Sequence, residues 1–184
     1  MRTARDGTDA LREALRAEGG TVAVVLGAPA QAQTHQLDQP GPAQLAAAGP
    51  RTRGLEREYE LLLEMILEGY RLRYEEPLVV CPNDPDLALL LGDQLYALGL
   101  ARLAALGDVE AVAELADVIS LVAQAHSVAD RELAHAVWEA GAVAVGWGPS
   151  EDHRRAKERA RGHQPDAPAA LRAAAAIAGG HPSL

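Results

Sequence analysis

The sequence contains no phenylalanine and only one cysteine, and aromatic residues make up just 3% of its 184 positions. A single cysteine excludes an internal disulfide framework and a cysteine-rich zinc site. No apolar run reaches the roughly 18 residues that a membrane span needs, and the N-terminus lacks a secretory pattern. Positive charge is also scarce, since 17 Lys and Arg stand against 26 Asp and Glu, a net charge of −9. We therefore expect a soluble, cytoplasmic protein that binds neither nucleic acid nor an anionic membrane surface.

Alanine and leucine are what the sequence has in abundance, with 38 and 26 residues. Both are strong helix formers, and together they supply about a third of the chain. The length allows one compact domain with additional tails. The composition therefore predicts an all-α fold, a helical bundle whose close-packed faces are built from small residues and leucine.

Changes in composition and helix boundary signals along the chain predict three parts. These are a short helix with a mobile linker (1–53), a helical bundle domain (54–148) and a charged, Ala-rich C-terminal tail (149–184). Residues 21–26 form an apolar run, but we expect no strand there because no second strand signal is found to pair with it. The linker prediction rests on residues 28–50, which are rich in Gln, Ala, Pro and Gly without periodicity. In the tail we expect a short helix at 167–178 and no packed core.

The middle part carries start and stop signals for four helices. Helical spacing of apolar residues predicts the first over 55–74, and Pro77 forces its end. Asp84 caps the second, with Pro85 in its first turn and Gly107 at its exit. Asp108 caps the third, and Ser127 with Asp130 resembles a capping box that opens the fourth over 128–145. Four helices with short connections predict a bundle.

The stretch Glu64–Ala97, EMILEGYRLRYEEPLVVCPNDPDLALLLGDQLYA, holds the most informative pattern. It resembles the first aspartate-rich region of the trans-isoprenyl diphosphate synthases, the polyprenyl synthetase family. In that family a DDxxD helix, an RRGKP segment and an AGD helix follow one another. Here Pro77 stands at the RRGKP proline and Leu90–Ala97 stands at the AGD helix, at the family's spacing. The resemblance covers about half of the chain and implies part of the all-α isoprenoid synthase fold.

The resemblance also assigns candidate site residues. Glu64 and Glu68 fall on the first and last aspartates of DDxxD, which hold Mg²⁺ in the family, while Met65 replaces the middle one. Arg73 falls on the first diphosphate-binding arginine, and Tyr74 replaces the second. A second aspartate-rich motif is missing downstream, as is the Lys-Thr that opens the family helix similar to 131–146. The resemblance therefore implies that metal and diphosphate binding are lost, and no catalytic residue or cofactor is assigned.

Plainer interpretations stand beside these. Glu64 and Glu68 also fit a solvated helix face, and Arg71 and Arg73 fit surface ion pairs with nearby glutamates. Asp93, in an otherwise apolar helix, is expected either to be buried with a hydrogen-bond partner or to lie at a subunit boundary. The pattern favours neither a metal site at His126 and His135 nor a nucleophilic Cys81. His153 and His163, in the charged tail, are expected to be solvated.

The second helix of the bundle is apolar around nearly all its circumference, so it must be covered on most sides. In the resembled family this region builds the dimer interface, which makes Leu91, Asp93, Leu95 and Leu98 candidate interface residues. Full cover by neighbouring helices of the same chain is the alternative.

The sequence therefore favours a non-catalytic, isoprenyl-synthase-like subunit that assembles with itself or with a larger synthase-like partner through apolar helices. One alternative is a small Mg²⁺-dependent enzyme that binds isoprenoid diphosphates with Glu64, Glu68 and Asp93 around the metal. The other is a homo-oligomeric helical scaffold with disordered docking tails.

Overall fold

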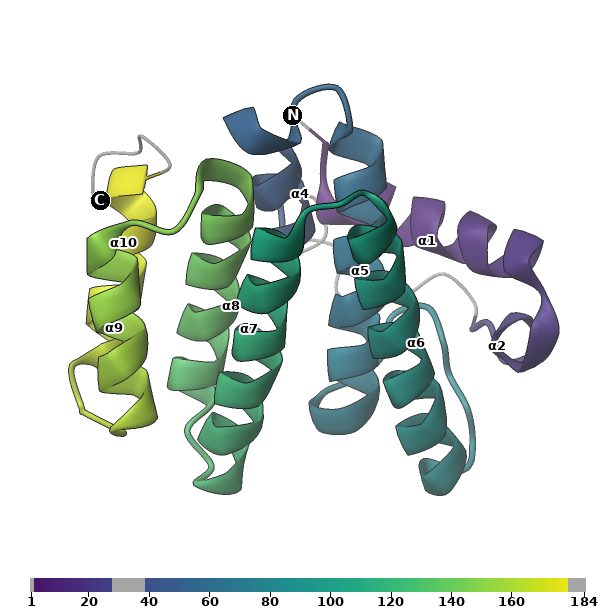
Figure 1. Cartoon of the computed structure of the whole chain (residues 1–184). Coiled ribbons are helices and arrows are strands. Elements are labelled where there is room, and N and C mark those ends of the chain that lie inside the picture. The colour runs from purple at the N-terminus through teal and green to yellow at the C-terminus, as the bar shows by residue number, and fades with distance from the viewer. Residues whose placement is uncertain (1, 28–38, 179–184) are drawn as a thin grey trace. The chain divides into compact units, whose positions relative to one another are not determined.

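Helices make up most of the computed structural model, which describes residues 2–27 and 39–178 (Figure 1). Within these residues the chain forms nine α-helices, one 3₁₀ helix and no strand, which confirms the predicted all-α fold. The contacts divide the chain into two units, one of residues 1–44 with 55–107 and the other of residues 45–54 with 108–184. The three-part division predicted from sequence stays a prediction.

The first unit is built on a pair of long helices, α5 and α6, that pack along each other. The helix bounds are α1 (Ala4–Glu18), α2 (Gly20–Val24), α5 (Glu56–Tyr74) and α6 (Pro85–Ala105). Thr3 and Asp6 form a capping box at the start of α1, and Gly19 ends it at φ 76°. α1 also contacts α5. The short helix expected near the N-terminus is therefore longer than the sequence indicates, and it is part of the packed core.

Glycines let α5 and α6 approach closely. A Cβ atom on Gly99 of α6 would lie 2.5 Å from Cγ1 of Ile66 and 2.9 Å from the Leu62 carbonyl oxygen. One on Gly69 would lie 2.8 Å from the Gly92 carbonyl oxygen. Carbon atoms do not approach that closely without displacement, so the α5–α6 spacing depends on these glycines.

The second unit contains four longer helices and a 3₁₀ helix. Their bounds are η1 (Pro50–Thr52), α7 (Val109–Ser127), α8 (Arg131–Trp147), α9 (Glu151–Arg161) and α10 (Ala167–Ala178). α7 packs on α8, and α10 packs on both α8 and α9. The remaining helix, α4 (Pro42–Ala47), lies where the two units meet along the sequence.

The predicted caps were right at two helices and wrong at a third. Asp84 accepts from the Asp86 amide at the start of α6, and Asp108 accepts from the Ala111 amide at the start of α7. Ser127, however, is the last residue of α7, and Asp130 alone caps α8 by accepting from the Leu133 amide. The capping-box prediction failed because Ser and Asp three residues apart also occur when one helix ends just before the next begins.

The C-terminal segment was expected to lack a packed core, and that expectation is wrong. α9 and α10 bury a set of mostly small residues against the second unit: Ala156, Ala160, Ala167, Leu171 and Ala174. Alanine contributes little apolar area per residue, but its small side chain lets helices pack closely. The prediction failed because the segment has low hydrophobicity, whereas the packing of α9 and α10 depends on close contact between small residues.

The linker prediction is wrong for the part of it that the structure describes. Residues 42–47 form α4 and residues 50–52 form η1, where the buried Thr52 hydroxyl lies within hydrogen-bond distance of the carbonyl oxygens of Ala46, Ala47 and Gly49. Residues 28–38 lie outside the described ranges. The doubted strand at 21–26 is indeed absent, but Leu26 pairs with Val80 in one isolated antiparallel bridge.

One helix among the described residues, α6, is long and apolar enough to cross a membrane by length and composition. Its most apolar window has a mean hydropathy of 1.3, and 28% of that window is buried. A core helix of a water-soluble protein passes the same test, so the observation is weak evidence for a membrane span.

The α5–α6 contact leads to a first prediction. Alanine normally stabilises a helix interior over glycine by about 1 kcal/mol. At Gly99 the added methyl group meets Ile66 and the Leu62 carbonyl. We expect Gly99→Ala to lower the free energy of unfolding by about 1–3 kcal/mol, as overpacking does. Urea denaturation followed by circular dichroism measures the change, and a gain in stability would contradict the close approach.

Candidate functional site

Three buried glutamates follow one another along one face of α5. Glu60, Glu64 and Glu68 are 3%, 1% and 0% exposed. A spacing of four residues places them on the same side of the helix. That side is turned into the first unit, because a Cβ atom on Gly7 of α1 would lie 2.6 Å from Oε1 of Glu64. The interpretation of Glu64 and Glu68 as a solvated helix face is therefore wrong.

Glu68 holds the segment that follows α5. Its Oε1 accepts from the main-chain amides of Leu78 at 3.0 Å, Val79 at 2.6 Å and Val80 at 2.9 Å. Its Oε2 accepts from Nη1 of Arg71 at 3.3 Å. Buried charge is tolerated only when it is paired and hydrogen-bonded, and this carboxylate is both. Glu68 thus stabilises the turn after Pro77, the residue at which the resemblance places the RRGKP proline.

Glu64 has fewer hydrogen-bond partners than Glu68. Its Oε1 accepts from Nε2 of Gln44 at 3.0 Å, and Gln44 donates at the same distance to Glu60. Its Oε2 is fully buried without a hydrogen bond, and Nη1 of Arg71 lies 3.7 Å away. Burial therefore raises the pKa of Glu64, although Arg71 and Gln44 oppose the increase. Burial in this setting therefore disfavours the charged form of Glu64 relative to an exposed carboxyl group.

Arg73, the candidate diphosphate ligand, forms an ion pair with Asp93 of α6. The Asp93 side chain is 62% exposed, so the alternative in which it is buried is wrong, and its position at a subunit boundary stays a prediction. The pair lies at the surface, where such contacts contribute little stability. Arg71 pairs with Glu68 as the plainer interpretation expected, while Arg73 pairs with an aspartate on the next helix instead of a glutamate.

The carboxylates of the candidate metal ligands Glu64 and Glu68 face hydrogen-bond donors of the protein. Across residues 2–27 and 39–178, no group of three or more His, Cys, Asp or Glu side chains is placed to hold a metal ion. A Mg²⁺ site needs several oxygens free to face the ion. The oxygens of Glu68 face main-chain amides and Arg71, and one oxygen of Glu64 faces Gln44.

The interface candidates on α6 are distributed over different faces. Leu91 and Leu95 are 2% and 0% exposed and belong to the core of the first unit. Leu98 is partly buried against the same core. The alternative of full cover by neighbouring helices of the same chain is wrong, because the opposite face of α6 is exposed. A row of exposed residues along that face, which we call the outer stripe of α6, consists of Leu90, Gln94, Ala97, Ala101 and Ala104; Asp86, Asp93 and Ala105 on the same side of the helix are exposed as well.

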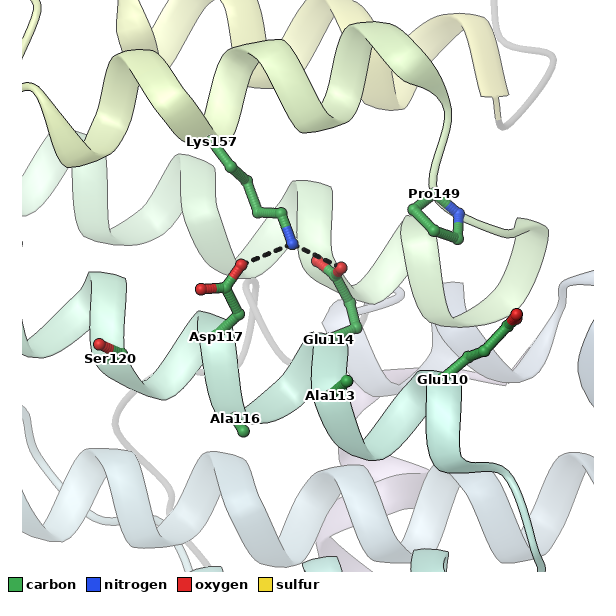
Figure 2. Close-up of a pocket in the computed structure, with 8 residues that line it drawn as sticks. All are labelled: Glu110, Ala113, Glu114, Ala116, Asp117, Ser120, Pro149 and Lys157. Carbon is green, nitrogen blue, oxygen red and sulfur yellow. Dashed lines mark hydrogen bonds and ion pairs between the residues drawn. The ribbon is translucent and has the colours of Figure 1, made fainter.

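The second unit contains a partly buried charged network that the sequence did not reveal. Glu114 of α7 accepts from Nζ of Lys157 at 2.7 Å, and its other oxygen lies 2.7 Å from Nε2 of His153. Lys157 also reaches Asp117 at 2.7 Å, and Arg161 pairs with the same aspartate. Figure 2 shows Lys157 extending from α9 between the carboxylates of Glu114 and Asp117. We call these five residues the α7–α9 network.

The network borders an open depression of about 510 Å³. Its lining consists of Glu110, Ala113, Glu114, Ala116, Asp117, Ser120, Pro149 and Lys157. Burial alone would raise the pKa of Glu114, but the hydrogen bonds and charges of His153 and Lys157 outweigh it and lower that pKa. Lys157 and Arg161 lower the pKa of Asp117 against burial in the same way. The polar atoms of the network are paired with one another, which ties α9 to α7.

Sequence reasoning expected His153 to be solvated, yet it is only 4% exposed. A signal existed in the spacing, because His153, Lys157 and Arg161 recur every four residues and so share one face of α9. Glu114 and Asp117 share a face of α7 for the same reason. Nothing in the sequence, however, says that these two faces meet.

No family model matches the sequence, and no curated protein and no solved structure matches it either. The resemblance to the isoprenyl diphosphate synthases therefore stays a prediction.

Two of the three buried glutamates of α5, Glu64 and Glu68, give a matched pair of substitutions. In Glu68→Gln, the amide nitrogen replaces an acceptor that faces Arg71 and the Leu78 amide, so we expect the free energy of unfolding at pH 7 to fall by about 3 kcal/mol. Glu64→Gln removes a carboxylate whose Oε2 accepts no hydrogen bond and whose charge is disfavoured by burial, so we expect a change smaller than about 1 kcal/mol or a gain. Urea denaturation of both variants measures the difference, and equal losses would contradict the distinct roles.

The α7–α9 network predicts acid sensitivity. Because the folded pKa of Glu114 is below its usual value of 4.5, its contribution to stability is present above about pH 4.5. That contribution is lost as the pH falls through the lowered pKa. We expect Glu114→Gln to cost about 3 kcal/mol at pH 7 and to flatten the loss of stability on acidification.

Urea denaturation between pH 7 and pH 3 measures this effect. Glu139→Gln is the matched control, since Glu139 pairs with Arg172 at the surface of α8 and its side chain is 48% exposed. The control should stay within about 0.5 kcal/mol of the parent chain. An unchanged acid profile in Glu114→Gln would contradict the prediction.

Proposed function

We propose that this chain is a non-catalytic helical subunit, similar in its middle part to the isoprenyl diphosphate synthases, that assembles with another chain through the outer stripe of α6. The observation that carries the proposal is the stripe itself. Four of its five residues are apolar, all five are exposed, and Leu90 is 68% exposed. A mostly apolar row of exposed residues on a helix supports an interaction surface.

The spacing of the stripe supports helix–helix contact. Its residues are separated by 4, 3, 4 and 3 positions along α6. This alternation keeps side chains in line along a seam between two packed helices. Alanine at Ala97, Ala101 and Ala104 lets a second helix approach closely, and Gln94 is the one polar residue in the seam.

Internal contacts of the candidate site residues support the non-catalytic part of the proposal. The residues that the resemblance places at metal-binding and diphosphate-binding positions are engaged within the chain. Glu68 binds main-chain amides, Glu64 binds Gln44, and Arg73 pairs with Asp93. Each of these side chains has a structural contact that ligand binding would have to replace.

The proposal predicts the mass of the protein in solution. We expect the parent chain to exceed the monomer mass at micromolar concentration and Ala101→Glu to weaken assembly at least tenfold, because a carboxylate would be buried in the seam. Sedimentation equilibrium measures both. Ala173→Glu is the matched control, since Ala173 is an exposed helical alanine on α10, and it should assemble like the parent.

Two outcomes would contradict the proposal. A parent chain that stays monomeric at tens of micromolar would contradict assembly. Mg²⁺-dependent turnover of an allylic diphosphate by the purified chain, abolished by Glu64→Gln, would contradict the non-catalytic role.

A further inference from the structure

The buried cluster around Glu64 in the first unit has more acidic than basic groups. It contains three carboxyl groups, those of Glu60, Glu64 and Glu68, and two guanidinium groups, those of Arg2 and Arg71. Nε of Arg2 lies 2.7 Å from Oε2 of Glu60, and Nη1 of Arg71 lies 3.3 Å from Oε2 of Glu68. If all three carboxyl groups are ionised, one of them has no cation of its own.

The carboxyl group without its own cation is that of Glu64. Its Oε2 is buried without a hydrogen bond, and Arg71 lies 3.7 Å from it, closer to Glu68 than to Glu64. Its Oε1 shares the Nε2 group of Gln44 with Glu60. Burying a charge with so few partners costs free energy, and protonation removes that cost.

The first turns of α1 pack directly on this carboxyl group. A Cβ atom on Gly7 would lie 2.3 Å from Nε2 of Gln44 and 2.6 Å from Oε1 of Glu64, so the contact has no room for an added methyl group or for a water molecule. The charges that act on Glu64 come from its own helix, where Arg71 favours ionisation and the two neighbouring glutamates oppose it. α4 contributes the uncharged amide of Gln44, and α1 contributes Gly7, which has no side chain.

We propose that the Glu64 carboxyl group holds α1 on α5 in a pH-dependent way: α1 packs on the protonated group, and loss of the proton loosens the first turns of α1. In the loosened state water reaches the carboxylate, which removes the cost of burying its charge. This inference is independent of the outer stripe of α6.

The sign of the pH dependence follows from the direction of the pKa shift. Burial raises the pKa of Glu64 above its usual 4.5 in the folded chain. The contribution of the protonated group to the packing of α1 is therefore complete below about pH 4.5. It is lost as the pH rises through the folded pKa, because the loosened state then binds fewer protons than the packed state.

Few other groups of the first unit titrate between pH 5 and pH 8. Carboxyl groups with ordinary pKa values titrate near pH 4, and histidine is absent from the described part of this unit. Hydrogen bonds with Thr3 lower the pKa of Asp6, which caps α1, below its usual 3.8. Burial raises the pKa of Cys81 above its usual 9.0. A transition of α1 in this range therefore points to Glu64.

Amide hydrogen exchange of the full chain tests the proposal, with EDTA present so that no divalent cation takes the place of the proton. Protection factors of the α1 amides are measured between pH 5 and pH 8 and corrected for the intrinsic pH dependence of exchange. In the parent chain we expect protection to fall at least about tenfold over this range. In Glu64→Gln, which cannot ionise, we expect protection to change less than about twofold. Glu58→Gln is the matched control, since Glu58 is an exposed residue of the same helix, and it should keep the parent's pH profile.

A direct titration keeps the test decisive if Glu64→Gln does not fold. In the parent chain labelled with ¹³C-glutamate, the chemical shift of the Glu64 Cδ atom reports the proton, and we expect its midpoint above pH 5. A midpoint at or below pH 5, or α1 protection in the parent chain that does not change with pH, would overturn the proposal. An equal fall of protection in Glu64→Gln would assign the transition to another group and would overturn it as well.

Discussion

The carboxylate of Glu68 is the contact on which the first unit depends. It lies on α5 with no exposure and accepts from three consecutive main-chain amides, those of Leu78, Val79 and Val80. The segment it holds pairs with Leu26 through the Val80 bridge, and its Leu78 carbonyl accepts from Arg12 of α1. One buried charge therefore connects α5, the turn after it and the N-terminal helices, and the donors that surround it offset its desolvation.

The second unit also buries charged side chains, and there the desolvation is offset by side chains of opposite charge. In the α7–α9 network, acids and bases alternate, so each buried charge has a neighbour of opposite sign. The carboxylates there have lowered pKa values, whereas burial raises the pKa of Glu64. The partners explain the difference: His153 and Lys157 bind Glu114 directly, while Arg71 remains 3.7 Å from Glu64, and Glu68 and Glu60 raise the pKa of Glu64 further. The charged neighbours therefore decide whether a buried carboxyl group has a raised or a lowered pKa.

Local signals in the sequence predicted the helices well, and long-range contacts account for what they missed. The caps Asp84 and Asp108 act within one turn, so the sequence contains all the information they need. The burial of Glu68 depends on amides ten to twelve residues away, and that of His153 depends on Glu114, 39 positions earlier. No periodicity encodes such pairings. The sequence shows the glutamates of α5 and the residues of the α7–α9 network, but it does not show which residues surround them.

The apolar circumference of α6 had two interpretations from sequence, cover within the chain or cover by another chain. The structure separates them by face, because Leu91 and Leu95 lie in the core and the outer stripe does not. The sequence of α6 is apolar around its circumference because residues on two of its faces, the buried face and the outer stripe, are mostly apolar. The buried face contacts α5 through Gly92 and Gly99, whereas the outer stripe alternates by four and three. If α6 packed only through its buried face, polar residues on its outer stripe would not lower the stability of the protein. Keeping alanine and leucine on that face instead retains an apolar surface that exposure to water disfavours and contact with a second helix would bury.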